Sequence, residues 1–358
     1  MKKKLSAVLV LSVCLCFAVA ASSLSAPAAT VNLIRNKAIT VQDLNKEIAA
    51  YEKAGIQMSA LDILQSMVNT EVFLQGAERD GVTVSDRQLD VLYNQVFQNA
   101  VQQAAQSGYS LSQEEFEKEV IAQMGSIAEY KETIRKQQII QTYLMQERGE
   151  EISSNIAPTE AEIKSFYRQN QQQFFQPECV KLAHIFIPTF ATTTPDNLEE
   201  VAQVQELNAA AYGRAMEADE KIKSGELTFE KAVSIYSQDT GSNGRGGDIG
   251  WLTMNNTEAR IGWGDEFCDT VLSMDDGEVS GVLQSYMGFH IVKVYVHLDA
   301  KILALTDPIS PEDTMTIHDY IAQVLANQKM QVNMNAALQD LTAELRGEAK
   351  IRILYKGN

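Results

Sequence analysis

The chain has 358 residues, a net charge of −17 at pH 7 and 45% hydrophobic residues. This length and apolar content suffice for two or three globular domains with cores of their own. The sequence has no stripe of basic residues, and an acidic protein repels the phosphate backbone of nucleic acids. Nucleic acid is therefore excluded as an expected partner.

The N-terminus has the pattern of a secretory leader. Three lysines at 2–4 precede an apolar run over 5–19, and candidate cleavage sites follow at Ala18-Val19-Ala20 and Ala26-Pro27-Ala28. We therefore expect a signal peptide over residues 1–28 and an exported protein, either extracellular or in the cell envelope. The run is shorter than the ~20 residues that span a bilayer, so membrane contact is expected only through the leader, if it stays uncleaved.

The four cysteines predict neither a lipid anchor nor a metal site. Cys14 and Cys16 lie in the leader, and neither follows the small residue that lipid modification requires. Cys179 and Cys268 are too few for a disulfide framework in a chain of this size. No close spacing of His and Cys indicates a metal site, and no cofactor is expected.

Residues 29–176 are predicted to form a helical domain. After a short extended segment at 31–39, apolar residues recur at helical spacing behind four candidate N-caps, and a further helix starts at Pro158-Thr159-Glu160. The candidate caps are Thr40, Ser85, Ser112 and Ser126. Core packing of an all-α region explains these helices. The alternative is a cradle for unfolded segments, which Met58, Met67, Met124 and Met145 would suit because methionine adapts to varied partners.

From Pro177 the pattern changes to that of an α+β domain over residues 177–298. Strands are expected at 180–187, 279–283 and 290–296, and helices at 198–224, 229–236 and 265–272. A glycine-rich turn occupies 244–250. Residues 299–358 are predicted to hold a helix from about 312 to 345 and a last strand at 351–355. The fold class is thus α+β: a small antiparallel sheet with surrounding helices, inserted in or following an all-α domain.

Five short motifs in this region resemble those of the parvulin-type peptidyl-prolyl cis-trans isomerases, in the same order. The helical region before them resembles the N-terminal chaperone domain of the bacterial envelope foldases PrsA and SurA. That resemblance implies that the C-terminal helix packs back on the N-terminal domain. The motifs are Ala183-His184-Ile185, Tyr236-Ser237-Gln238-Asp239, Gly246-Gly247-Asp248-Ile249-Gly250, Gly277-Glu278-Val279-Ser280 and Gly288-Phe289-His290-Ile291-Val292.

The resemblance implies a catalytic site made of His184, Asp239 and His290. From the residues alone, Asp239 could instead cap the turn before Gly241. Four further residues map on or near the family's apolar substrate pocket: Phe267, Met254, Trp263 and Met287.

Two departures from the family pattern concern this pocket: the loop at 252–264 is lengthened, and position 287 is changed. From the residues alone, Phe267 could instead be an ordinary core residue. Met287 replaces a hydroxyl residue that the family often has three positions before the last histidine. The segment 189–200 lacks Lys and Arg, so no preference for phosphorylated substrates is expected.

The sequence therefore predicts an exported foldase that catalyses cis-trans isomerisation of X-Pro bonds. Its partners would be unfolded or partly folded exported polypeptides that contain proline. Rotation about the peptide bond needs neither nucleophile nor metal. The alternative is a non-catalytic holdase chaperone whose parvulin domain only binds clients.

Overall fold

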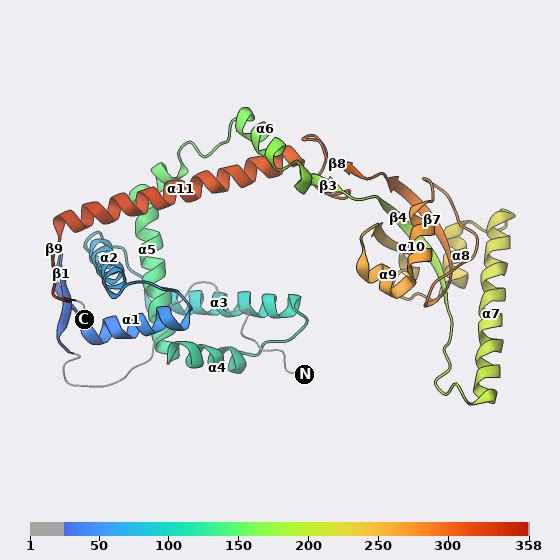
Figure 1. The fold of residues 1–358 in the computed structure, drawn as a ribbon, viewed down its shortest axis with the longest axis horizontal. Helices are drawn as coiled ribbons and strands as arrows, with labels where there is room; N and C mark the ends of the chain where they lie inside the picture. The colour runs from blue at the N-terminus through green and yellow to red at the C-terminus, as the bar shows by residue number, and fades with distance from the viewer. Residues whose placement is uncertain (1–24, 357–358) are drawn as a thin grey trace. The chain divides into compact units, whose positions relative to one another are not determined.

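The structure is a computed structural model and describes residues 25–356, which form two compact units (Figure 1). The first unit comprises residues 25–158 and 324–356, and the second comprises residues 159–323. Most of the predicted leader, residues 1–24, lies outside the described residues. Within residues 25–356, no helix is both long and apolar enough to cross a membrane.

The first unit is built mainly of helices, and each begins after a Ser or Thr side chain. That side chain accepts a hydrogen bond from a backbone N–H of the first turn, which satisfies a donor without a partner inside the helix. The helices are α1 (Val41–Lys53), α2 (Ala60–Arg79), α3 (Asp86–Gln106), α4 (Gln113–Met124) and α5 (Ile127–Ser153).

A small antiparallel sheet completes the first unit, in the order β2-β1-β9. Its strands are β1 (Pro27–Asn32), β2 (Asn36–Thr40) and β9 (Lys350–Ile353). Residues of β1, α2, α5 and the second half of α11 (Ile317–Glu348) share one core, in which Leu64, Tyr143 and Leu345 are buried. The C-terminal segment therefore packs with the N-terminal helices.

The beginning of β1 belongs to this core. Ala28 is fully buried, and its carbonyl accepts the N–H groups of Leu354 and Tyr355. The carbonyl of Ala26 accepts the N–H of Val41 at the start of α1. Signal-peptide cleavage after Ala28 would remove these contacts.

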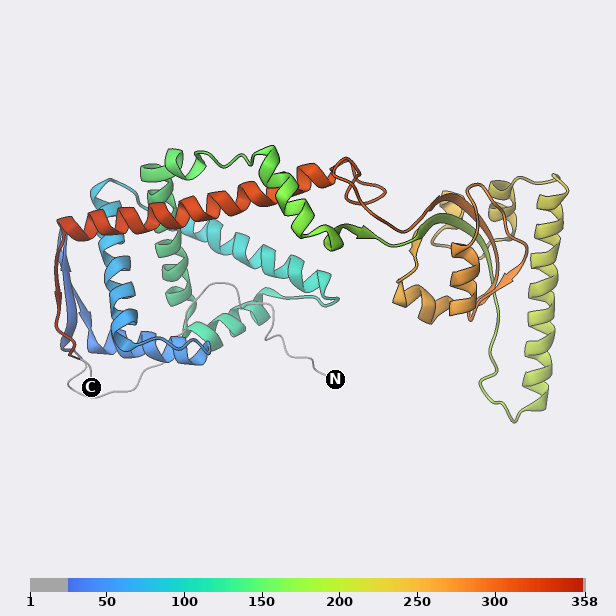
Figure 2. The same cartoon turned by 45° about the horizontal axis from the view of Figure 1, so that its top comes forward.

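The second unit contains a four-stranded antiparallel sheet with helices on both faces (Figure 1, Figure 2). Leu182 and Val292 face a core with α10, whereas Ala183 and Ile185 face a core with α8, as the two-residue period of a strand requires. The predicted α+β class is confirmed. The sheet has the order β5-β4-β7-β6, from β4 (Cys179–Pro188), β5 (Asp248–Thr253), β6 (Leu283–Gln284) and β7 (Gly288–Leu298). Its helices are α7 (Leu198–Lys223), α8 (Phe229–Tyr236), α9 (Thr257–Trp263) and α10 (Asp265–Leu272).

A smaller part of the second unit precedes and follows this sheet. It comprises α6 (Glu160–Gln169) and a ribbon of β3 (Phe175–Gln176) with β8 (Lys301–Ile302). His318, in the first turn of α11, lies 2.9 Å from a carboxylate oxygen of Glu160 at the start of α6.

Three predicted boundaries were wrong. The glycine-rich turn expected at 244–250 is shorter, because β5 begins at Asp248. The strand expected at 279–283 is reduced to a single bridge between Val279 and Lys293, followed by the short β6. The Ser280 hydroxyl oxygen accepts a hydrogen bond from the Val292 N–H, and this side-chain bond interrupts the main-chain ladder. The last helix begins at Ile317 rather than near residue 312, because Thr316 caps it by accepting the N–H of Asp319.

Candidate functional site

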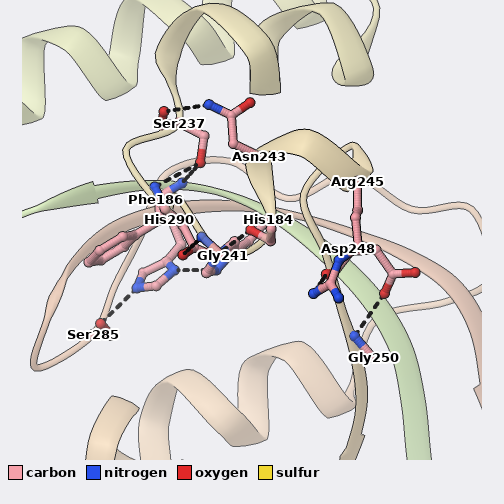
Figure 3. Close-up of polar contacts among 12 residues, drawn as sticks. His184, Phe186, Ser237, Gly241, Asn243, Arg245, Asp248, Gly250, Ser285 and His290 are labelled. Carbon is pink, nitrogen blue, oxygen red and sulfur yellow. Dashed lines mark hydrogen bonds and ion pairs between the residues drawn. The ribbon is translucent and has the colours of Figure 1, made fainter.

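Two buried histidines meet on one face of the central strands. His184 lies on β4 and His290 on β7, two residues apart in the strand register, so their side chains are diagonal neighbours. Their Nδ1 atoms are 3.2 Å apart (Figure 3). His184 Nε2 is 3.1 Å from the Oδ2 of Asp239, and His290 Nε2 is 2.8 Å from the Oγ of Ser285. Four side chains therefore form one hydrogen-bonded chain.

The partners of Ser285 determine where the protons of this chain lie. Its hydroxyl oxygen accepts the backbone N–H groups of Met287 and Gly288, so its single O–H must donate. The acceptor is His290 Nε2 at 2.8 Å, because the competing Gly288 carbonyl is farther away, at 3.4 Å. His290 must then carry its proton on Nδ1 and donate it to His184 Nδ1. His184 in turn donates from Nε2 to the carboxylate of Asp239. Each donor thus meets an acceptor while both imidazoles are neutral.

Asp239 is both the end of this chain and the organiser of the turn that follows α8. Its Oδ1 accepts the N–H of Gly241 at 2.9 Å, and its Oδ2 also accepts the hydroxyl of Ser242. Capping the turn and pairing with His184 are therefore compatible, since the carboxylate has two oxygens.

The glycine cluster attaches this turn to β4. The N–H of His184 donates to the carbonyl of Gly247 at 2.9 Å. Gly247 has φ +84°, and a Cβ there would lie 2.5 Å from the carbonyl oxygen of His184. Only glycine allows this approach without displacement. Farther along, Asp248 accepts the N–H of Gly250 (Figure 3), which is a turn contact.

Burial keeps the histidines neutral. Removal from water lowers the pKa of His184, although the hydrogen bond to Asp239 opposes that shift. Burial and the neighbouring His184 lower the pKa of His290 to about 3. Burial alone would raise the pKa of Asp239, but the hydrogen bonds from Ser242, His184 and Gly241 outweigh it and hold that pKa below its usual value. The site therefore contains two neutral imidazoles and one carboxylate.

Aromatic rings enclose the histidine pair. The ring centroid of Phe186 lies 4.9 Å from that of His290, and the centroid of Phe267 lies 4.7 Å from it. The ring centroid of Trp263 lies 6.5 Å from that of His184 and 5.6 Å from that of Phe267. The middle of the hydrogen-bonded chain thus lies in a mostly apolar environment, where its hydrogen bonds are stronger than they would be in water.

The four residues predicted to bind substrate are not equivalent. Phe267 and Trp263 lie against the histidines, and Phe267 is only 3% exposed, so it forms the floor of the site. Met287 is 50% exposed on the turn that holds Ser285. Met254 is 45% exposed just after β5, where its N–H donates to the Glu178 carbonyl. At that position Met254 makes no hydrogen bond to the histidine network.

Sequence reasoning missed Ser285, Ser242 and Phe186. Ser285 supplies a hydroxyl two residues before position 287, where the family often has one, because the tight turn before β7 folds Ser285 back onto His290. Phe186 follows His184 by two residues, so the strand period alone could have placed it on the same face. Over residues 25–356, no group of three His, Cys, Asp or Glu side chains could hold a metal ion.

Comparison with known proteins gives a family match over the part of the chain that contains these residues. Residues 184–295 match the family model described as rotamase, PPIC-type PPIASE domain. The chaperone SurA of Saccharophagus degradans is 25% identical over 274 residues, which cover 74% of this chain and 56% of that protein. The foldase protein PrsA of Clostridium kluyveri is 28% identical over 158 residues, 44% of this chain and 38% of that protein.

A solved structure reported for the SurA-like chaperones PEB4 and Cj1289 of Campylobacter jejuni has a TM-score of 0.36 at 15% identity. It covers 92% of this chain and 99% of that one. The chain spans about half the length of the SurA proteins that it matches. Residues 184–295 thus form a PPIC-type, parvulin-type peptidyl-prolyl isomerase domain, in a chain that is similar to SurA and PrsA and has a helical N-terminal region.

Proposed function

We propose that the domain is an active peptidyl-prolyl cis-trans isomerase and that the chain assists the folding of exported polypeptides. The observation that carries this proposal is the hydrogen-bonded chain Asp239–His184–His290–Ser285 beside the aromatic rings of Phe186, Trp263 and Phe267. The matched PPIC-type model supports the reaction class. The leader pattern supports export.

The reaction requires only differential stabilisation of a twisted amide. The barrier to rotation is ~18–20 kcal/mol, and each tenfold acceleration requires about 1.4 kcal/mol of extra binding to the twisted state. Twisting removes amide resonance, so the peptide nitrogen becomes more basic and the C–N bond longer. An apolar surface for the proline ring and a fixed polar network beside the amide both favour that state.

We assign the roles as follows. Phe267 and Trp263 provide the apolar surface for the proline ring. His184 and His290 hold each other's ring orientation, and Ser285 fixes the tautomer of His290. Of the four hydrogen-bonded side chains Asp239, His184, His290 and Ser285, only Asp239 is partly exposed. Its carboxylate therefore sets the electrostatic field that the substrate amide meets.

A protease-coupled assay on a chromogenic Ala-Ala-Pro-Phe peptide tests the proposal. The purified protein should accelerate isomerisation, and His290→Ala should reduce kcat/KM by at least about tenfold. His297→Ala is the matched control, because His297 lies on the same strand but bonds Met274 and Glu178 instead. A wild-type protein without any acceleration would refute the enzymatic proposal.

A separate cavity in the helical unit favours a second function, holding unfolded chains. It has a volume of about 700 Å³ and is lined in part by Met67, Leu74, Met124 and Ile140, with Glu132 and Lys136 among its polar residues. Flexible methionines suit varied apolar segments. If the protein suppresses aggregation of an unfolded client and Leu74→Asp abolishes this while isomerisation persists, the holding activity belongs to this cavity.

A further inference from the structure

The second unit contains an apolar pocket away from the histidine network. The pocket has a volume of about 440 Å³, within the range of small-ligand sites. It lies between the β3–β8 ribbon, the end of β5 and the loop before α11. Cys179, on its wall, precedes His184 by five residues on β4, which corresponds to roughly 16 Å along the strand. The lining includes Phe174, Phe175, Trp251, Leu303, Ile317 and Tyr320.

Two buried hydrogen-bond donors in this lining have no acceptor. Among residues 25–356, three buried side-chain polar atoms lack a partner, and two of them are Trp251 Nε1 and Gln176 Nε2 at this pocket. Unpaired buried donors are rare because each has lost water without a replacement. Two in one apolar pocket point to a ligand that carries an acceptor oxygen.

The carboxylate of Glu312 approaches the indole N–H of Trp251 without reaching hydrogen-bonding geometry. The Nζ of Lys181 lies 2.7 Å from Oε1 of Glu312 at the pocket rim. This ion pair first, and the nearby Trp251 N–H second, lower the pKa of Glu312. The indole nevertheless has no acceptor within hydrogen-bonding geometry. An incoming neutral acceptor therefore need not displace the ion pair.

The backbone beside the pocket is also open to an extended chain. β5 is an edge strand of the sheet. Met254 donates to the carbonyl of Glu178, and in an antiparallel ladder alternate residues pair. Leu252 therefore bonds β4, and the main-chain groups of Trp251 face away from β4. An edge strand of this kind can accept a peptide as an additional strand.

We propose that this pocket binds an extended polypeptide segment, with an apolar side chain inside the cavity and a main-chain carbonyl on the donors of Trp251 and Gln176. Neutral donors, an apolar lining and a free strand edge match a peptide better than an anion or a sugar. The proposal rests on the proposed function in taking client polypeptide as the partner. It assigns the client a contact that is independent of proline and of the histidines.

Indole NMR tests the contact directly. The chain has two tryptophans, Trp251 and Trp263, so the ¹⁵N-labelled full chain gives two indole resonances, which Trp251→Phe assigns. The probe is a proline-free heptapeptide of alternating Ser and Phe. On its addition the Trp251 indole proton should move downfield as it gains an acceptor, while the Trp263 resonance stays in place.

Affinity for the fluorescein-labelled form of this peptide tests the pocket by mutation. Trp251→Phe keeps an aromatic ring but loses the indole N–H, and should weaken binding roughly fivefold, the value of one neutral hydrogen bond. Phe175→Ala should weaken it about tenfold or more, through lost apolar contact. The matched control is Phe190→Ala, because Phe175 is 53% exposed and Phe190 51%, yet Phe190 does not line the pocket.

The two proposals fail separately. His290→Ala should lower kcat/KM for isomerisation at least about tenfold and still bind the proline-free peptide, whereas Trp251→Phe should isomerise normally. The pocket proposal is overturned if the wild-type chain does not bind the peptide, or if Phe175→Ala and Phe190→Ala weaken binding equally. It is also overturned if the Trp251 resonance moves with protein concentration alone, which would assign the pocket to a second copy of the chain.

Discussion

The Nδ1 atoms of His184 and His290 face each other at 3.2 Å, so one of the two rings must donate to the other. Because the O–H of Ser285 goes to the far side of His290, His290 is the donor and His184 the acceptor. The direction of the whole chain, from Ser285 to Asp239, follows from this pair. The predictions below test that direction and the loop that supports it.

Replacing the carboxylate of Asp239 separates its charge from its hydrogen bonds. The amide oxygen of Asp239→Asn can still accept from His184, so we expect thermal stability to change by only a few degrees. Loss of the negative charge should lower the pKa of His184 further, because Asp239 opposes the shift caused by burial. Isomerisation should fall about tenfold. NMR titration of the imidazoles and the coupled assay check both effects.

Asp248→Asn is the control for that variant. Asp248 bonds the N–H of Gly250 in a turn and lies outside the histidine chain. Its replacement should leave both the His184 pKa and the isomerase rate unchanged. Equal effects of the two substitutions would contradict a special role for Asp239.

Removing the hydroxyl of Ser285 should affect both stability and rate. Ser285→Ala leaves His290 Nε2 and the N–H groups of Met287 and Gly288 without a partner, at a cost of about 1–3 kcal/mol for a buried group. The tautomer of His290 is then no longer fixed, so kcat/KM should fall several-fold. Ser285→Thr should restore most of the rate.

Ser280→Ala provides the comparison for this loss. Its hydroxyl bonds the Val292 N–H on the same strand as His290, but it makes no hydrogen bond to a side chain of the histidine network. We expect a similar loss of unfolding free energy without loss of rate. If Ser285→Ala is as active as Ser280→Ala, the hydroxyl has no role in positioning His290.

Acid should destabilise the isomerase unit through its buried histidines. An unfolded histidine has a pKa near 6.5, whereas burial lowers the pKa of His290 to about 3. Between about pH 6.5 and 3 the unfolded chain therefore binds a proton that the native site does not. As the pH is lowered through that window, the unfolding free energy should decrease, by up to ~1.4 kcal/mol per pH unit for each such histidine.

Urea unfolding at pH 7.5 and 5.0 measures this slope, and tryptophan fluorescence reports on the second unit because both tryptophans lie there. His290→Gln should reduce the loss at pH 5.0. His297→Gln should increase the loss of stability at pH 5.0. The Met274 carbonyl and Glu178 raise the pKa of His297. Protonated His297 therefore stabilises the fold below pH 6.5, and this effect is lost as the pH rises through the raised pKa. Identical slopes for all three proteins would rule out this assignment.

Gly247→Ala should disrupt the loop that holds Asp239. Residue 247 has φ +84°, and the new Cβ would lie 2.5 Å from the backbone oxygen of His184. We expect a loss of about 1–3 kcal/mol of unfolding free energy and a reduced isomerase rate. Gly244→Ala, three residues earlier, meets nothing within 4 Å and should be nearly neutral. Differential scanning calorimetry compares the two variants.

Signal-peptide cleavage should occur before Ala26. Cleavage after Ala28 would remove the carbonyls of Ala26 and Ala28, which accept three backbone N–H groups from α1 and the chain after β9. N-terminal sequencing of the exported protein should therefore give a start upstream of residue 26, consistent with the earlier candidate Ala18-Val19-Ala20. A start at Ala29 would contradict this account of β1.

The sequence was most informative where a pattern is local. Thr40, Ser85, Ser112 and Ser126 cap helices as predicted, because an N-cap depends on residues three positions apart. The motifs around His184 and His290 also identified the matched domain correctly. Local patterns could not show that Ser280 interrupts a strand, since its hydroxyl bonds Val292 twelve residues away.

The sequence by itself determined the α+β class, the helix starts and the residue types of the candidate site. Only the tertiary structure decided that Ser285, rather than a residue at position 287, orients His290, and that Met254 lies apart from the histidines. It also brought Trp251 and Gln176 to one pocket with the loop before α11. These relationships depend on strand register and on contacts between segments distant in the chain, which side-chain periodicity does not encode.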